Sequence, residues 1–125
     1  MRRRAVSPRE RTKFGARPTA GYASRAEAER AAELRLLARA GAIADLEEQP
    51  LLDVHPDGCR PIRYRADFRY REGGRVVVED VKSPATMTDV FRLKWKLLAW
   101  KYPACVRRIS LRRRAGGFEI RDEEG

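Results

Sequence analysis

The stretch Arg75-Val-Val-Val-Glu-Asp-Val-Lys82 decides the fold of this chain, because it predicts a buried strand that ends in charged residues. Three consecutive valines favour a pleated, buried environment, and Gly73-Gly74 before them are typical of a turn. Side chains alternate between the two faces of a strand, so Asp80 and Lys82 share one face and Glu79 lies on the other. Buried charges are costly unless they are paired or hold a metal ion. We therefore interpret this stretch as the candidate functional site.

Composition indicates one basic domain. The chain has 125 residues, with 28 Lys and Arg against 18 Asp and Glu, which gives a net charge of +10. This balance predicts a polyanionic partner, and nucleic acid is the commonest one, although basic charge that only aids solubility is the alternative. Residues 1–20 are polar and basic, so we expect a flexible arm there and a single domain at 21–125.

The sequence contains no signal for a membrane or a zinc site. No apolar run approaches the roughly 20 residues that a membrane span needs, and the basic N-terminus lacks the apolar region of a signal peptide. Cys59 and Cys105 lie far apart, and neither belongs to a CxxC pair. We expect a cytoplasmic protein with reduced thiols and no membrane contact.

Hydrophobic periodicity predicts an α/β domain with a mixed sheet flanked by helices. Ser24-Arg-Ala-Glu27 is a capping-box signature that opens the first helix. At 100° per residue, Glu27 shares a face with Ala31, Leu34 and Ala38, which is the face expected to pack on the sheet. In chain order we expect a helix at 24–40, a linking stretch at 43–49, a short strand at 51–54, strands at 62–70 and 75–82, a helix at 89–101, a strand at 106–112 and a short return strand at 118–120.

Two of these elements have a clear pattern of faces. The strand at 62–70 alternates, with its apolar face formed by Ile62, Tyr64, Ala66, Phe68 and Tyr70 and its polar face by Arg63, Arg65, Asp67 and Arg69. A Gly-Gly turn joins this strand to the valine strand as an antiparallel hairpin. In the second helix, the apolar face is predicted to contain Val90, Leu93, Leu97 and Trp100, widened by Phe91 and Leu98, with Lys94 inside the same arc.

The hairpin brings together residues that suit metal-assisted chemistry. Asp67 and Asp80, on adjacent strands, can share a Mg²⁺ or Mn²⁺ ion, which prefers oxygen ligands. Lys82 would lie beside the activated water, and Glu27 would reach in from the first helix. The alternatives are salt bridges of Asp67 with Arg65 or Arg69, an ion pair between Asp80 and Lys82, and a purely capping role for Glu27.

Asp67…Asp80-Val81-Lys82 resembles the signature of the PD-(D/E)XK nuclease superfamily. The chain is more similar still to a small phage-encoded endonuclease-like family that is known as a domain of unknown function, and more distantly similar to Holliday-junction resolvases and to the endonuclease subunit of some transposases. The segments that carry this resemblance are S-x-x-E-A and a following Arg at 24–30, Gly-x-Ile to Gln-Pro at 41–50, Tyr-x-Ala-Asp-Phe-x-Tyr at 64–70, Val-Glu-Asp-Val-Lys at 78–82, and Lys94-x-Lys96.

The resemblance implies a restriction-endonuclease-like αβββαβ core, a divalent metal and cleavage of DNA. It implies that Asp67, Asp80 and Glu27 are metal ligands and that Lys82 is the catalytic lysine. The chain departs from the pattern at Ala66, where relatives often have Pro, and at Ser83-Pro84, where they often have Gly. Many such enzymes act as homodimers, which cut two strands symmetrically.

Other residues receive weaker interpretations. Glu79, on the opposite face of its strand, is either a structural residue or a hydrogen-bonding neighbour of the metal ligands. Gln49 either contacts the active-site lysine or water, or is an ordinary loop residue. The residues expected to contact the DNA backbone are Arg63, Arg65, Arg69, Lys94 and Lys96.

Three functions compete. The first is a metal-dependent endodeoxyribonuclease that processes phage or prophage DNA, with branched or junction DNA as a fitting substrate. The second is a catalytically inactive DNA-binding module of the same fold, which has no reason to retain Asp67, Asp80 and Lys82 together. The third is an RNA-associated basic protein, which needs no metal-site carboxylates.

Overall fold

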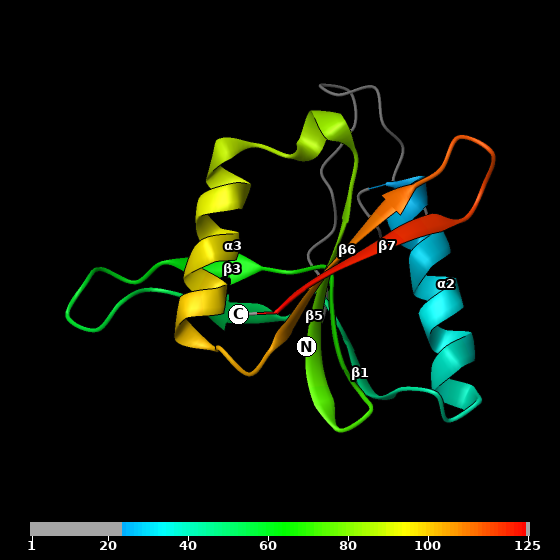
Figure 1. The fold of residues 1–125 in the computed structure, drawn as a ribbon, viewed down its shortest axis with the longest axis horizontal. Helices are drawn as coiled ribbons and strands as arrows, with labels where there is room; N and C mark the ends of the chain where they lie inside the picture. Colours follow the sequence, from blue (N-terminus) through cyan, green and yellow to red (C-terminus); the bar gives the residue numbers. More distant parts are fainter. Residues whose placement is uncertain (1–23, 125) are drawn as a thin grey trace, which may run out of the picture.

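A computed structural model describes residues 24–124 of the chain, and the predicted N-terminal arm lies outside them. Its elements are α2 (Arg25–Arg39), β1 (Ala44–Glu48), β2 (Leu51–Asp53), β3 (Arg63–Arg65), β4 (Phe68–Glu72), β5 (Arg75–Lys82), the 3-10 helix η1 (Pro84–Thr86), α3 (Asp89–Lys101), β6 (Val106–Arg112) and β7 (Phe118–Glu124). The valine strand is therefore β5, which is the central strand of a five-stranded sheet with the order β1-β4-β5-β6-β7 (Figure 1).

The sheet is mixed, as the sequence predicts. Strands β4 and β5 form the expected antiparallel hairpin, and β5 pairs in parallel with β6 after the chain returns through α3. The hairpin turn consists of Gly73 and Gly74, which have φ angles of 58° and 79°. Two consecutive positive φ angles match the twist of the flanking strands, and glycine adopts them without steric strain.

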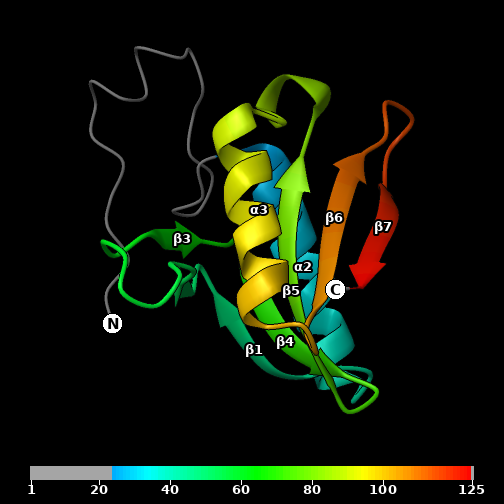
Figure 2. The ribbon, with the colours of Figure 1, turned by 60° about the vertical axis from the view of Figure 1, so that its left-hand side comes forward.

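The two helices cover opposite faces of this sheet, so the domain has three layers (Figure 2). On one face, Val77 of β5 packs in a cluster with Ala31 and Leu34 of α2. On the other face, Val78 packs in a cluster with Trp95 and Leu98 of α3. Alternation along β5 thus sends successive valines into two separate cores, which explains why the strand is apolar on both faces.

Side-chain caps fix the start of each helix. The Ser24 hydroxyl accepts a hydrogen bond from the Glu27 amide at 3.1 Å, which confirms the predicted start of α2. The Thr88 hydroxyl accepts from the Phe91 amide at 3.1 Å and opens α3 in the same way. These caps place Glu27 and Phe91 in the first turns of their helices.

The predicted strand at 62–70 is not continuous. The chain leaves regular pairing at Ala66 and Asp67, so that β3 pairs with β2 in a separate two-stranded sheet and β4 joins the main sheet. The alternating face itself is correct, because Tyr64 and Ala66 are buried on one side of the break and Phe68 on the other. However, the two segments enter different cores, with Tyr64 in the α3 core and Phe68 in the α2 core.

The predicted linking stretch at 43–49 contains strand β1. This strand lies at the edge of the sheet, is mostly exposed and pairs with β4 in an irregular register. Its acidic sequence has no apolar alternation, so periodicity does not reveal it. Its position is supported by Glu47, whose carboxylate accepts two hydrogen bonds from Arg69 at 2.9 and 2.7 Å.

The prediction for the apolar face of α3 was wrong at its centre, although Phe91 and Leu98 at its margin are buried. Val90, Leu93 and Trp100 are 63%, 58% and 61% exposed. The face that packs on the sheet instead consists of Phe91, Trp95 and Leu98. Helix α3 therefore has two apolar faces, and periodicity alone does not say which of them is buried.

Two leucine substitutions on α3 test this assignment. Leu98→Ala removes a fully buried side chain, so we expect the free energy of unfolding to fall by about 2–5 kcal/mol. Leu93→Ala, on the exposed face, should change it by no more than about 0.5 kcal/mol. Urea denaturation followed by circular dichroism measures both values. Equal losses in the two variants would contradict the assignment.

Candidate active site

Asp67 and Asp80 meet where the β4–β5 ladder ends. The last ladder pair is Phe68 opposite Glu79, and beyond it each aspartate side chain binds the backbone of the other strand. An Asp80 carboxylate oxygen accepts a hydrogen bond from the Asp67 amide at 2.8 Å, and an Asp67 carboxylate oxygen accepts from the Val81 amide at 2.8 Å. The break between β3 and β4 thus brings the two carboxylates together across the strands.

Asp80 and Lys82 form a contact on the α3 face of β5. The Lys82 ammonium nitrogen lies 3.5 Å from an Asp80 carboxylate oxygen. The same nitrogen lies 4.1 Å from the centre of the Phe91 ring, which is a cation–π distance. Lys82 is therefore held between a carboxylate of its own strand and an aromatic ring from the first turn of α3.

Tyr64 is a site residue that the sequence analysis did not identify. Its hydroxyl donates a hydrogen bond to the Asp80 carboxylate, and both residues are buried. The alternating pattern predicted Tyr64 only as a core residue. Its ring does pack near the rings of Phe91 and Trp95. A buried tyrosine hydroxyl needs a polar partner, which is the signal that it lies near a buried polar group.

Glu27 and Gln49 adjoin the aspartates from the α2 side. The Glu27 side chain is buried and accepts a hydrogen bond from the Gln49 side-chain amide at 3.0 Å. The Gln49 backbone amide donates to the Asp67 carbonyl at 2.8 Å, with Gln49 in the left-handed region at a φ of 57°. Gln49 therefore connects the helix acid to the segment that contains Asp67.

These carboxylates repel one another. The pKa of Asp67 is raised well above its ordinary value by burial first, and then by the charges of Asp80 and Glu27. Burial also raises the pKa of Asp80, although the Lys82 charge and the Tyr64 hydrogen bond oppose the rise. A site that disfavours several nearby negative charges is one that a cation would stabilise.

The donor chemistry fits a hard divalent cation, but the ligands are few. Among residues 24–124 there is no group of three or more His, Cys, Asp or Glu side chains that could hold a metal ion. Magnesium is commonly held by one or two carboxylates, with water and substrate phosphate at its other positions. The Asp67–Asp80 pair suits that mode of binding, and the predicted part of Glu27 as a third ligand stays a prediction.

Comparison with known proteins identifies the family. Residues 12–114 match the family described as "Protein of unknown function (DUF1064)". The chain belongs to this family. No curated protein matches it. The crystal structure of SSO0001 is similar to this DUF1064 chain with 12% sequence identity and a TM-score of 0.49, and the match covers 78% of the present chain and 48% of SSO0001. The chain thus spans about half the length of that protein.

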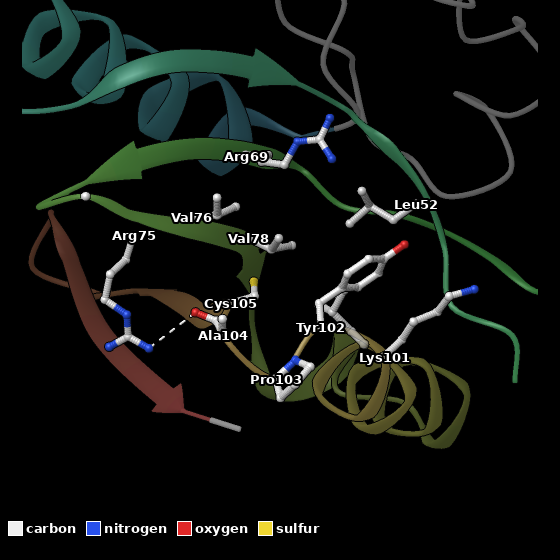
Figure 3. Close-up of a pocket in the computed structure, with 12 residues that line it drawn as sticks. Leu52, Arg69, Arg75, Val76, Val78, Lys101, Tyr102, Pro103, Ala104 and Cys105 are labelled. Carbon is white, nitrogen blue, oxygen red and sulfur yellow. Dashed lines mark hydrogen bonds between the residues drawn. The ribbon is translucent and has the colours of Figure 1, made fainter.

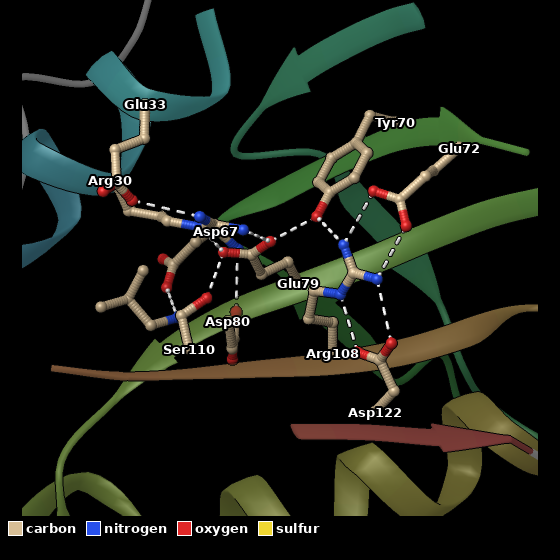
Figure 4. A network of polar contacts seen from close by, with 11 residues as sticks. Arg30, Glu33, Asp67, Tyr70, Glu72, Glu79, Asp80, Arg108, Ser110 and Asp122 are labelled. Carbon is tan, nitrogen blue, oxygen red and sulfur yellow. Dashed lines mark hydrogen bonds and ion pairs between the residues drawn. The ribbon is translucent and has the colours of Figure 1, made fainter. Parts of the chain in front are cut away.

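Glu79 has a different environment on the opposite face of β5 (Figure 4). It is fully buried, and its carboxylate accepts two hydrogen bonds from Arg30 of α2 at 2.6 and 3.1 Å. The hydroxyls of Tyr70 and Ser110 donate to the same carboxylate. This arrangement gives Glu79 a structural role, because it fastens α2 to the sheet.

The predicted DNA-contacting residues of this DUF1064 chain have varied surroundings. Arg69 is held by Glu47, whereas Arg63 and Arg65 are exposed on β3. The Nε atom of Arg63 lies 3.5 Å from an Asp53 carboxylate oxygen. The Arg65 guanidinium donates a hydrogen bond to the Gln49 carbonyl at 2.9 Å. On α3, Lys94 is half-buried and Lys96 is exposed.

In the part of the chain that the structure describes, no helix has the length and apolar character to cross a membrane.

A groove of about 700 Å³ lies at the other end of β5 (Figure 3). Its lining includes Gly74, Val76 and Val78 of the hairpin, together with Tyr102 and Cys105 after α3. Burial raises the pKa of the Cys105 thiol. The groove is mainly apolar and adjoins the start of β5, so it is separate from the carboxylates at the end of the strand.

Removing the Glu79 carboxylate should destabilise the fold strongly. Glu79→Ala leaves Arg30 charged, buried and without this partner, so we expect the free energy of unfolding to fall by about 3–5 kcal/mol in urea denaturation. Glu72→Ala is the matched control, because Arg108 keeps its contacts with Asp122, and it should cost about 1 kcal/mol or less. A small loss in Glu79→Ala would refute the structural role.

Proposed function

We propose that this chain is a metal-dependent endodeoxyribonuclease with a restriction-endonuclease-like core. The observation that carries the proposal is the meeting of Asp67 and Asp80 across two strands, with the Lys82 ammonium 3.5 Å from Asp80. An αβββαβ core corresponds to α2, the strands β1, β4 and β5, then α3 and β6. The order of the strands in the sheet supports this correspondence.

Asp67 and Asp80 would hold the divalent ion, Mg²⁺ or Mn²⁺. Burial and then the charges of Asp80 and Glu27 raise the pKa of Asp67, and a bound cation would offset both effects. Once bound, such an ion stabilises the charge that develops on a phosphodiester and makes a water molecule a better nucleophile. The buried Tyr64 hydroxyl would keep the Asp80 carboxylate in place as the site fills.

Lys82 would act on the reacting phosphate. Its ammonium group is directed by Asp80 on one side and by the Phe91 ring on the other. In this position it would donate a hydrogen bond to the attacking water or to a phosphate oxygen, and its charge would stabilise the transition state. Arg63 and Arg65 are exposed and would hold the DNA backbone with little sequence readout.

Cleavage of supercoiled plasmid and of a synthetic four-way junction with Mg²⁺ or Mn²⁺ tests the proposal. We expect Asp80→Asn to lower the cleavage rate by about 100-fold or more. Removal of a residue that only hydrogen-bonds a metal ligand already costs about 10- to 100-fold, and Asp80 would itself be a ligand. EDTA should abolish cleavage. Asp57→Asn, at an exposed turn position, is the matched control and should cleave like the wild type. Metal-independent DNA binding without cleavage would favour the inactive DNA-binding module.

Metal binding is a second readout that does not need activity. Titration of Mn²⁺ by calorimetry should show a site in the wild type that is lost in Asp80→Asn. Lys82→Met should retain this site but lower the cleavage rate by about 100-fold or more, because Lys82 acts on the phosphate rather than on the ion. Loss of metal binding in Lys82→Met would contradict this division of roles.

A further inference from the structure

The outer face of α3 has an apolar stripe that residues 24–124 leave mostly exposed, with only Leu97 packed in part against the core. Val90, Leu93 and Trp100 are each more than half exposed, and Leu97 between them is half-buried. We call these four residues the outer stripe. Exposed apolar side chains that gather on one face, a tryptophan among them, commonly mark an interaction site, because burying them removes apolar surface from water.

The spacing of the outer stripe is that of a helix–helix seam. Its residues are separated by three, four and three positions, which are the a and d positions of a heptad. The stripe extends over about 15 Å, at 1.5 Å per residue. A narrow a/d stripe is typical of packing against one other helix, whereas a helix that lies in a membrane surface has a broader apolar face.

The residues beside the stripe select an acidic partner. In the same heptad, Lys94 and Lys101 occupy e positions and Lys96 occupies a g position, with Asp89 as the one acidic residue among them. The Lys101 ammonium also donates to the His55 carbonyl at 3.1 Å. Charges at e and g positions determine which helix is accepted, so lysines on both sides of the stripe favour a helix with carboxylates on both sides.

Two other occupants fit the stripe less well. A second copy of this chain would place lysines opposite lysines along most of the seam and would bring together two molecules of net charge +10. DNA would neutralise the lysines, but its charged backbone does not bury a row of valine, leucine and tryptophan side chains. An acidic amphipathic helix satisfies the apolar stripe and its cationic borders together.

We propose that the outer stripe of α3 docks an acidic amphipathic helix of another protein. The helix would pack its own a and d residues between Leu93, Leu97 and Trp100 and would place its carboxylates beside Lys94, Lys96 and Lys101. Val90, Leu93 and Trp100 of the stripe are exposed, whereas Phe91, which contacts Lys82 in the candidate active site, is buried on the sheet side of α3. The docking proposal therefore does not depend on the nuclease proposal.

Binding of a synthetic helix to the full chain tests the proposal. The probe is a labelled peptide of three heptads with Leu at a and d and Glu at e and g, and fluorescence anisotropy follows its binding. Leu93→Ser and Trp100→Ser should each weaken binding by at least about tenfold, as expected for central contacts of an interface. Leu36→Ser, at a position 60% exposed on α2, is the matched control and should bind like the wild type.

Three further measurements distinguish the occupants. A peptide of the same composition with its leucines scrambled should bind at least about tenfold more weakly, because charge alone does not fill the stripe. Equal binding of the two peptides would overturn the proposal. So would a dimer in light scattering that Leu93→Ser dissociates, which would assign the stripe to a second copy. Binding to phosphatidylcholine–phosphatidylglycerol vesicles that Leu93→Ser abolishes would assign it to a membrane surface.

Discussion

Two consecutive carboxylates are buried on opposite faces of the central strand, and the rest of the structure depends on how each is compensated. Glu79 is surrounded by donors, because Arg30, Tyr70 and Ser110 all donate to it. Asp80 has fewer compensating contacts and lies near a second carboxylate, so its pKa is raised by burial in spite of Lys82 and Tyr64. Glu79 therefore stabilises the fold, whereas the burial of the Asp80 carboxylate has a cost that a bound cation would reduce.

This difference also explains the local architecture around the site. Ordinary ladder pairing between the strands ends at Phe68 and Glu79, and the side chains of Asp67 and Asp80 then supply the acceptors that the next backbone amides need. At this point β3 turns away into its own small sheet, and its Tyr64 hydroxyl donates to Asp80. The break in the strand is thus the feature that forms the site.

The sequence predicts the secondary structure well but not the choices that tertiary packing makes. The capping signature at Ser24, the Gly73-Gly74 turn and the alternation of Val77 and Val78 between two cores are local signals, and the structure confirms them. The break at Ala66 was missed because alternation continues through it in phase while the two segments enter different cores. The Tyr64–Asp80 contact was missed for a similar reason, since it joins residues sixteen positions apart whose pairing no local pattern encodes.

Helix α3 shows most clearly why pattern alone fails. A helix with two apolar faces has two solutions for packing on a sheet, and the fit of the side chains decides between them. The Phe91 ring packs against Trp95 and lies under the Lys82 ammonium, so the face that was chosen also builds the candidate site. With the outer face against the sheet, Lys82 would lose this ring. The packing that brings Phe91 to the half-buried Lys82 thus leaves Leu93 and Trp100 exposed, and an exposed stripe of that kind persists at little cost where a partner covers it.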